Sequence, residues 1–437
     1  MTQEQALEIL KMGYNVYLTG PAGSGKTFLL NQYVDFLKSK NIGIGITAST
    51  GIAATHMNGI TIHSWSGIGI KNEIDQEELT GMLRSKFYKK RFKKTKVLII
   101  DEISMLHASK LDLINLICQA FKENDLPFGG LQIIFSGDFF QLPPIDKEND
   151  HSGFAYTSNI WNNMNLKICY LTEQFRQEDS NFLQALNSIR SGQSNQNTVD
   201  LLMTRFGKDI ESDITPLKLF THNVDADAIN MEELNKINSK SYINEMSCSG
   251  SEYLITTLKR GCLAPEKLIL KKGAVVMFLK NNFKEHYANG TVGKVVDFVS
   301  GYPVVKVKNK EILVEPAHWE IEEYGSTQAR ITQLPLRLAW AITIHKSQGM
   351  NLDMAEIDLG KAFAYGMGYV ALSRIKTLNG IKLLSLNDIA LQVDNDIIEI
   401  DKTFFQLSQT FCEEIQNMSE KDKKFEQKSF LLRLYGD

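Results

Sequence analysis

Short apolar runs alternate with segments of helical spacing along the first third of the chain. The runs are bounded by polar residues, as in strands buried inside a sheet. Between the first two runs, Lys26–Lys38 carries apolar residues at helical spacing. Strands that alternate with helices form a parallel sheet covered by helices, so the pattern predicts an α/β domain. The predicted strands are residues 15–19, 42–48, 97–100 and 132–135.

The same alternation returns in the second half of the chain after a block of different character. In that block, residues 251–325, short strands are separated by turn signals such as Asn289-Gly290 and Ser300-Gly301. This composition predicts a small β-barrel-like subdomain inserted into a second α/β domain. The elements predicted around it are strands at 217–220, 354–359 and 381–385 and helices through about 240 and near 366–373.

The length of the chain divides these patterns into domains. A single hydrophobic core rarely grows beyond about 250–300 residues, so 437 residues imply at least two domains. We predict an α/β fold with two parallel-sheet domains and small insertions. The first domain is predicted at 1–190, with a small basic insertion at about 66–96, the second at 191–255 and 326–437, and the β-barrel-like subdomain at 256–325.

Composition excludes several classes of protein. Five cysteines with no Cys-x-x-Cys pair argue against a disulfide framework or a zinc knuckle. No apolar run reaches about 18 residues, and the N-terminus carries Glu4 and Glu8 in place of an apolar signal core. We therefore expect a cytoplasmic protein without a membrane span. The net charge of −3 excludes a uniformly basic surface but not a basic groove.

A glycine-rich segment joins the first predicted strand to the first predicted helix. A P-loop has this sequence in this context: its backbone N–H groups and the helix N-terminus bind phosphate oxygens. Lys26 is expected to reach the β- and γ-phosphates, and Thr27 to offer a hydroxyl to Mg²⁺. A glycine-rich turn with a surface lysine is the alternative. The predicted ATP-binding residues are Gly20, Pro21, Ala22, Gly23, Ser24, Gly25, Lys26 and Thr27.

Two adjacent carboxylates follow the predicted strand at 97–100. An apolar strand that ends in acids is typical of a Walker-B motif, in which Asp101 would hold Mg²⁺ and Glu102 would act as general base on the attacking water. Solvated surface acids are the alternative. The phosphate loop about 75 residues upstream favours the Walker-B interpretation.

Several longer segments resemble the Pif-one (petite integration frequency) family of superfamily-one DNA helicases, and in particular a minimal core like that of bacterial or phage members, related to RecD-like helicases. They occur in the family's order across both halves of the chain. The segments are Thr47–Ala54, Thr61–Ser64, Asp101–Met105 (motif II), Pro127–Pro144 (signature segment and motif III), Leu171–Gln177, Ala341–Gly349 (motif V) and Tyr369–Arg374 (motif VI).

The resemblance implies two RecA-like P-loop domains with ATP bound between them. Gln141 then resembles the glutamine that senses the γ-phosphate, and Arg176 and Arg374 resemble arginines that reach it from the other side. A guanidinium is permanently charged and forks onto phosphate oxygens, which suits that role. Gln5 resembles the glutamine that reads adenine, with Gln3 as a rival.

The same resemblance implies single-stranded DNA and duplex or forked DNA as partners, ATP and Mg²⁺ as cofactors, and 5′→3′ movement in replication, repair or recombination. Its DNA-facing motifs contain Thr50, His63, Thr343 and His345; Trp65 is expected either to stack on a base or to pack in the core. Eight of the thirteen residues in 84–96 are basic, with Phe87, Tyr88 and Phe92 interleaved. This segment is either a DNA-facing insertion or a solvated helix face.

Two other functions fit part of the pattern. A translocase that strips proteins from DNA without unwinding it would share every motif. A P-loop kinase or nucleotide switch would use the phosphate loop and the Asp101-Glu102 pair, but it leaves Arg374, Gln141 and the motif V segment unexplained.

Overall fold

A computed structural model of the chain describes residues 1–69, 71, 73–144, 153–211, 215–221, 226–282, 285, 287–323 and 326–436. Residues 325 and 437, which end the predicted barrel-like subdomain and the predicted second domain, lie outside the described residues. Within the described part of the chain, no helix is long and apolar enough to cross a membrane.

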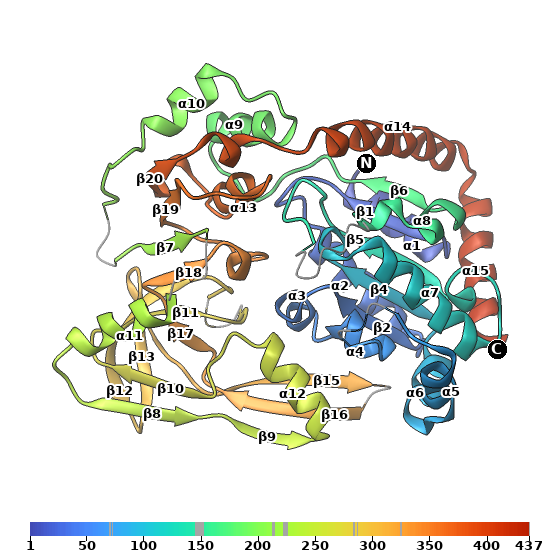
Figure 1. Ribbon diagram of the computed structural model, residues 1–437, viewed down its shortest axis with the longest axis horizontal. Helices are drawn as coiled ribbons and strands as arrows, with labels where there is room; N and C mark the ends of the chain where they lie inside the picture. The colour runs from blue at the N-terminus through green and yellow to red at the C-terminus, as the bar shows by residue number, and fades with distance from the viewer. Residues whose placement is uncertain are drawn as a thin grey trace.

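Six parallel strands form the first sheet, in the order β3-β2-β4-β5-β1-β6 (Figure 1). Every residue of β4 and β5 is buried, as expected for parallel strands covered on both faces. The four strands predicted from apolar runs are confirmed, while β3 and β6 were not predicted. The strands are β1 (Val16–Thr19), β2 (Ile44–Ala48), β3 (Ile60–Thr61), β4 (Val97–Asp101), β5 (Gln132–Ser136) and β6 (Lys167–Tyr170).

Alternate residues of these strands pack into two different hydrophobic layers. Val97 and Ile99 of β4 pack with α1 and α2, whereas Leu98 and Ile100 pack with α7 and α8 on the opposite face. The helices in this half of the chain are α1 (Gln3–Lys11), α2 (Lys26–Ser39), α3 (Gly51–His56), α4 (Ile62–Ser66), α5 (Gln76–Arg84), α6 (Lys86–Lys94), α7 (Ala108–Lys122) and α8 (Asn159–Asn163).

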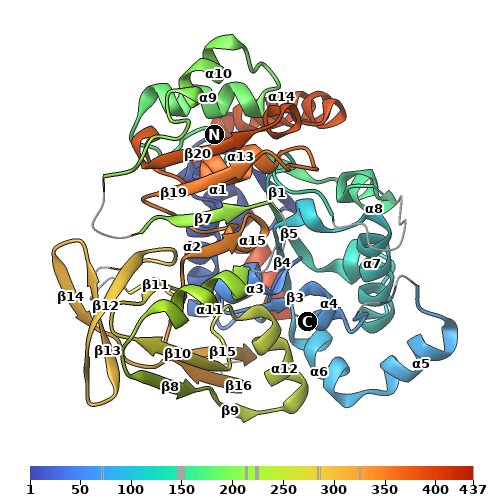
Figure 2. The ribbon, with the colours of Figure 1, turned by 60° about the vertical axis from the view of Figure 1, so that its left-hand side comes forward.

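A second parallel sheet has the order β18-β7-β19-β20. It lies beside the first sheet (Figure 2). Its elements are β7 (Leu217–Phe220), β18 (Ala341–Thr343), β19 (Ala355–Leu359), β20 (Ile381–Leu386), and the helices α9 (Ser180–Arg190), α10 (Gln196–Met203), α11 (Ala226–Lys236) and α13 (Met367–Ser373).

Antiparallel strands fill the block between β7 and β18. They form sheets of five, three and two strands, with orders β14-β13-β12-β11-β17, β15-β16-β9 and β10-β8. Ser300 and Gly301 have φ of 51° and 87° in the β12–β13 hairpin, which explains the turn signal. The elements are β8 (Ser241–Glu245), β9 (Ser247–Gly250), α12 (Glu252–Gly261), β10 (Lys267–Lys271), β11 (Val275–Phe278), β12 (Val292–Val299), β13 (Tyr302–Val307), β14 (Lys310–Leu313), β15 (Ala317–Glu323), β16 (Ser326–Gln333) and β17 (Leu336–Leu338).

The last two helices, α14 (Asn395–Asn417) and α15 (Glu420–Gly436), leave the second sheet and cover the first (Figure 1). Phe411, Ile415 and Phe430 pack in the same layer as α1 and α2. The sequence prediction had placed 326–437 with the second domain. An amphipathic helix shows which of its faces is buried but not against which sheet, and the structure places these helices on the first.

Candidate nucleotide site

The phosphate loop lies between β1 and α2. Gly23 and Gly25 both have φ of 83°, and a Cβ at Gly25 would come within 2.0 Å of the Gln3 side chain, so glycine is required there. The Lys26 ammonium donates hydrogen bonds to the carbonyls of Gly20 at 2.7 Å and Pro21 at 3.2 Å. Burial lowers the pKa of Lys26, while the nearby carboxylates of Asp138 and Glu102 oppose this. The lysine is therefore folded over its own loop, where phosphate oxygens would replace the two carbonyls.

Gln3 is the glutamine that lies against this loop. Its side-chain amide donates to the Ser24 carbonyl at 3.0 Å. Gln5, which the sequence comparison favoured, instead completes a capping box with Thr2, since its carbonyl accepts the Thr2 amide at 2.9 Å. Two residues of separation on a helix point side chains in different directions, and here Gln5 lies toward Cys412 on α14.

Asp101 and Glu102 lie at the end of β4, as predicted. Asp101 is buried, and burial raises its pKa, although the hydrogen bond from the Glu102 amide at 2.9 Å opposes this. Glu102 has φ of 51°, and its carboxylate accepts a hydrogen bond from the Gln348 side chain at 3.0 Å. Burial and the neighbouring charge of Asp101 raise the pKa of Glu102 to about 7, which suits a general base near neutral pH.

Gln141, Arg374 and Arg176 are gathered at the same site from three parts of the chain. The Arg374 guanidinium is buried; it donates to the Gln141 side-chain carbonyl at 3.4 Å and, through Nε, to the Val370 carbonyl at 3.0 Å. Arg176 donates to the Ser373 carbonyl at 2.9 Å. Burial and the neighbouring charge of Arg374 lower the pKa of Arg176 to about 9. Two neighbouring guanidinium groups, one buried and one partly buried, suit the binding of a polyanion.

Two further residues of the site escaped the sequence prediction. The Tyr369 hydroxyl accepts a hydrogen bond from the Ala22 amide of the phosphate loop at 2.9 Å. Gln348 bonds Glu102 as described above. Both residues come from the second half of the chain and fall inside the motif V and VI segments. Their position in those segments was the available signal, but only the folded structure shows that Tyr369 contacts the phosphate loop and that Gln348 contacts Glu102.

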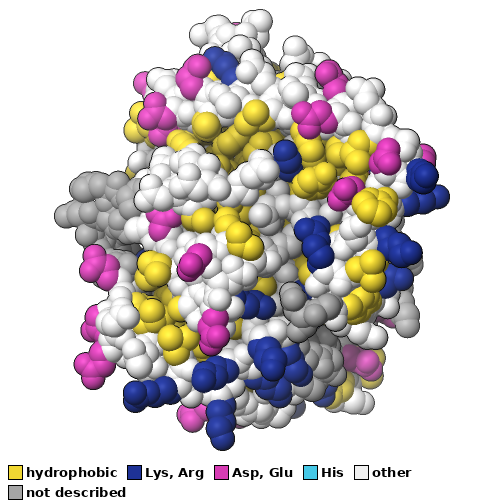
Figure 3. All heavy atoms as spheres, turned by 90° about the vertical axis from the view of Figure 1, so that its right-hand side faces the viewer, with side chains coloured by type: hydrophobic (Ala, Val, Ile, Leu, Met, Phe, Trp, Pro, Cys, Tyr) yellow, Lys and Arg dark blue, Asp and Glu magenta, His cyan; other side chains and the backbone are white. Residues whose placement is uncertain are grey.

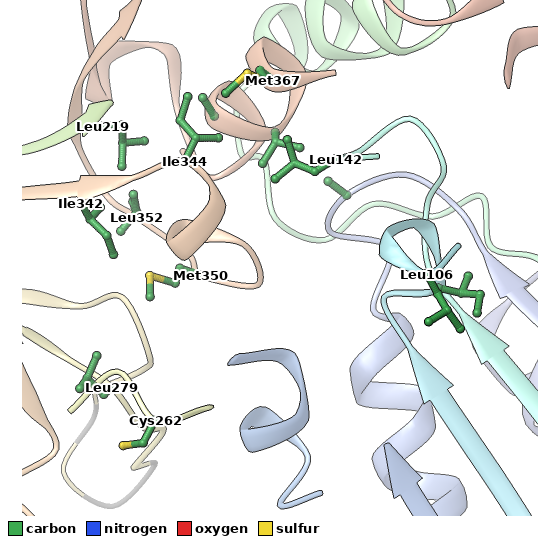
Figure 4. Packing of buried hydrophobic residues seen from close by; sticks show 14 of the residues in the cluster. Leu106, Leu142, Leu219, Cys262, Leu279, Ile342, Ile344, Met350, Leu352 and Met367 are labelled. Carbon is green, nitrogen blue, oxygen red and sulfur yellow. The ribbon is translucent and has the colours of Figure 1, made fainter. Parts of the chain in front are cut away.

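The apolar contacts around the site connect the two sheets. Leu142, directly after Gln141, points toward Met367 of α13, and Ile344 lies beside them (Figure 4). All three side chains are fully buried. This packing fixes the relative positions of Gln141 and α13.

The donor set around Asp101 suits Mg²⁺. Thr27 and Asp101 offer a hydroxyl and a carboxylate, and Mg²⁺ in nucleotide sites takes one or two such protein oxygens together with phosphates and water. The buried Ser24 hydroxyl has no hydrogen-bond partner among the described residues, as expected where a phosphate oxygen would lie. No group of three or more His, Cys, Asp or Glu able to hold a metal by itself occurs in the described ranges.

The predicted DNA-facing residues separate into two groups. Thr50, His63 and His345 are partly exposed; burial lowers the pKa of His63 to about 4, so this histidine is neutral near pH 7. Thr343 is buried, with 2% of its surface exposed. Trp65 is 3% exposed, and its ring lies 4.7 Å from that of Phe92. Trp65 therefore offers no exposed ring to a base and belongs to the core, the second of its two expected roles.

Most of the basic segment forms α6, which has one buried face and one exposed, lysine-rich face. Phe92 is buried and stacks on Phe121 at 4.2 Å, and Arg91 is buried where it donates to the Trp65 carbonyl at 2.7 Å. Figure 3 shows lysine and arginine side chains gathered at the lower end of the face that carries α5 and α6. The exposed members on α6 include Lys86, Lys89, Lys90 and Lys93.

Comparisons with known proteins agree with this geometry. A family model described as "PIF1-like helicase" matches residues 3–200. The ATP-dependent DNA helicase Pif1 of Psychrobacter sp. is 42% identical over 90% of this chain and 69% of its own length, and that of Bdellovibrio bacteriovorus is 35% identical over 91% and 90%. Among solved structures, Pif1 of Bacteroides sp. in complex with ADP-AlF4 has a TM-score of 0.80 at 30% identity, covering 92% and 96%. Bacteroides Pif1 bound to ssDNA has a TM-score of 0.65 at the same identity and coverage.

Proposed function

The chain belongs to the PIF1-like helicase family and is an ATP-hydrolysing DNA helicase, and from this premise we propose that it hydrolyses ATP between its two parallel sheets, at the phosphate loop. One observation carries the proposal: residues of α13 and its C-cap contact both the loop and Gln141. Tyr369 accepts from Ala22, and Arg374 donates to Gln141. A site assembled from both halves of the chain transmits changes at the phosphates to the relative position of the two sheets.

The roles of the first sheet's residues follow from their positions. Lys26 and the loop amides hold the β- and γ-phosphates, with Gln3 against the loop at Ser24. Thr27 and Asp101 would hold Mg²⁺, which when bound neutralises phosphate charge. Glu102 takes the proton of the attacking water. Its pKa of about 7 places it where a base is effective near neutral pH.

The second sheet's residues stabilise the charge that develops on the transferred phosphate. Arg374 and Arg176 are both desolvated, and a desolvated guanidinium acts more strongly on a phosphate than one in water. In the structure these groups bond to protein carbonyls and to Gln141. ATP would compete for them, which links nucleotide binding to small movements of α13.

We infer that single-stranded DNA and forked DNA are the partners, with movement 5′→3′ along the strand. A Bacteroides Pif1 structure contains ssDNA, and another is titled for unwinding of forked dsDNA. Thr50, His63 and His345 are partly exposed in segments that resemble DNA-facing motifs. In this structure α12 packs on α3, the helix that Thr50 caps, so a strand bound at Thr50 would lie next to α12.

ATP hydrolysis measured with and without single-stranded DNA tests the proposal. We expect DNA to stimulate turnover in the unmodified protein and Lys26→Ala to abolish it. Lys40→Ala, at the far end of the same helix, is the control and should retain full turnover. Unwinding of forks that carry a single 5′ or 3′ tail then shows the direction in which the protein moves along the strand. The proposed site would be refuted if the rate of ATP hydrolysis were the same with and without DNA, or if the Lys26→Ala variant still hydrolysed ATP.

A further inference from the structure

A buried arginine outside all the helicase-like segments lies beside the nucleotide site. Arg190, the last residue of α9, is 8% exposed. Its guanidinium contacts Asp138 at 3.0 Å, the Tyr170 hydroxyl at 2.6 Å and Asp401 at 3.3 Å, and it lies 4.3 Å from the centre of the Phe140 ring. One side chain therefore joins α9, the loop after β5, the end of β6 and α14.

Asp138 connects this arginine to the reacting end of the site. Its side chain is fully buried and accepts hydrogen bonds from the Phe140 amide at 3.3 Å and from the Gln141 side chain at 3.4 Å. It also accepts from the Tyr369 hydroxyl at 3.5 Å. Asp138 thus contacts both the glutamine proposed to sense the γ-phosphate and the tyrosine that bonds the phosphate loop.

Asp401 brings the C-terminal part of the chain into the same cluster. It lies on α14 and accepts hydrogen bonds from Arg190 and, at 3.0 Å, from the Tyr170 hydroxyl. About two turns further along α14, the Ser408 hydroxyl accepts a hydrogen bond from the Tyr170 amide at 3.0 Å. The helix that leaves the second sheet to cover the first is therefore fixed to the site by polar contacts as well as apolar ones.

We propose that Arg190 is a positioning residue for ATP hydrolysis: through Asp138 it holds Gln141 and Tyr369 in place, and through Asp401 it makes the seating of α14 part of the assembled site. This inference rests on the proposed function. It adds to that function a requirement for residues that lie outside the helicase-like segments.

The chemistry of the side chain explains why an arginine stands here. A guanidinium carries five donors in a rigid fork, so it bridges two carboxylates and a hydroxyl at once, whereas a lysine ammonium concentrates its charge at one point. If the bridge is lost, Asp138 loses its guanidinium partner and is held only by its hydrogen bonds from the Phe140 amide, Gln141 and Tyr369, so its position can shift. Displacement of a reacting group by about 1 Å costs up to about 100-fold in rate.

The test compares Arg190→Lys and Asp401→Asn with the unmodified protein. We expect Arg190→Lys to lower the kcat of DNA-stimulated hydrolysis by about 10–100-fold while the KM for ATP stays within about threefold, because Gln141 acts on the transferred phosphate. Asp401→Asn keeps the shape and removes one charge, so kcat should fall in the same direction by a smaller factor. The double variant should lose no more than Arg190→Lys alone, because the residues act as one unit.

Arg205→Lys is the matched control. Arg205 is a partly buried arginine whose side chain donates to the carbonyls of Ile381 and Asn379, and both of these partners lie in the second half of the chain around β20. A loss of packing alone would lower the melting temperature in both arginine variants and leave kcat per folded molecule unchanged. Only the positioning role lowers kcat in Arg190→Lys and not in Arg205→Lys.

DNA-stimulated hydrolysis by the unmodified protein tests the proposed function, whereas the kcat of the variants tests the positioning role of Arg190. If the unmodified protein shows no DNA-stimulated hydrolysis, the proposed function is wrong. If it does, and Arg190→Lys and Asp401→Asn both keep the unmodified kcat, the positioning role is overturned. Should Arg190→Lys fail to fold, Asp401→Asn decides alone: a lowered kcat at unchanged KM supports the inference and an unchanged kcat overturns it.

Discussion

Replacing the proposed general base should make this protein less active and more stable. Glu102 lies beside Asp101 in a partly buried site, and its pKa is raised from the ordinary 4.5 to about 7. The fold therefore disfavours the ionised carboxylate. Glu102→Gln keeps the size and the capacity to bond Gln348 but removes the charge. We expect hydrolysis to fall by about 10²-fold or more, since the amide cannot accept the proton of water.

The stability change depends on pH in a defined direction. Because the folded pKa lies above the unfolded one, the favourable contribution of Glu102 is complete below about pH 4.5 and is lost as pH rises through about 7. A pKa difference of one corresponds to about 1.36 kcal/mol, so the upper limit of the loss is about 3 kcal/mol. Glu102 is partly exposed, and solvent screening reduces this to on the order of 1–2 kcal/mol.

Urea denaturation of Glu102→Gln and the unmodified protein at pH 5 and pH 8 measures this difference. The variant should be more stable at pH 8, and the gap should shrink to less than about 1 kcal/mol at pH 5. Glu123→Gln is the control, since Glu123 also has φ of 51° but is exposed at the end of α7. Equal stability of Glu102→Gln and the unmodified protein at pH 8, or a gap that does not change with pH, would refute the burial argument.

Three further predictions follow from the site and from α6. Arg374→Lys should lower DNA-stimulated kcat by about 10³-fold, because a lysine cannot fork onto phosphate oxygens; single-turnover rates above a tenth of the unmodified value would contradict this. Tyr369→Phe removes the hydroxyl that accepts the Ala22 amide, which leaves that amide free to bind phosphate. Nucleotide binding should therefore tighten by up to about tenfold in a fluorescent-nucleotide titration, and unchanged or weaker binding would show that the hydroxyl does not compete with phosphate. By contrast, Trp65→Ala should cost about 3–5 kcal/mol of stability through the cavity it leaves. Replacing three of the exposed lysines of α6 by glutamine should weaken single-strand binding and reduce its salt slope by roughly 0.7 per lost contact, and an unchanged slope would assign α6 to a solvated surface. The lysines are Lys89, Lys90 and Lys93.

The phosphate loop and the acidic pair were predictable from sequence because their chemistry is local. Gly20–Thr27 and Asp101-Glu102 are contiguous stretches whose neighbours are apolar strands. The position of a P-loop after a strand and before a helix is enough to place its backbone amides. The same local logic predicted four strands of the first sheet and three of the second.

Residues that depend on how elements pack were predicted less well. The sequence favoured Gln5 with Gln3 as a rival, and only the direction of α1 relative to the loop places Gln3 against Ser24. Trp65 has the composition of either a stacking or a core residue, and burial against Phe92 decides between them. Side-chain direction on a helix changes by about 100° per residue, so two residues that are close in sequence can face quite different surroundings.

The sequence by itself therefore predicted the groups that we propose take part in the reaction: the lysine of the loop, the two acids and the arginines of the motif-like segments. Tertiary structure alone decided which partners hold them. The contacts from Tyr369 to Ala22, from Gln348 to Glu102 and from Arg190 to both Asp138 and Asp401 each join residues 52 to 347 positions apart. No local pattern encodes such pairs. An apolar stripe indicates that a face is buried, and a buried polar residue needs a hydrogen-bond partner, but neither identifies the distant element that it contacts.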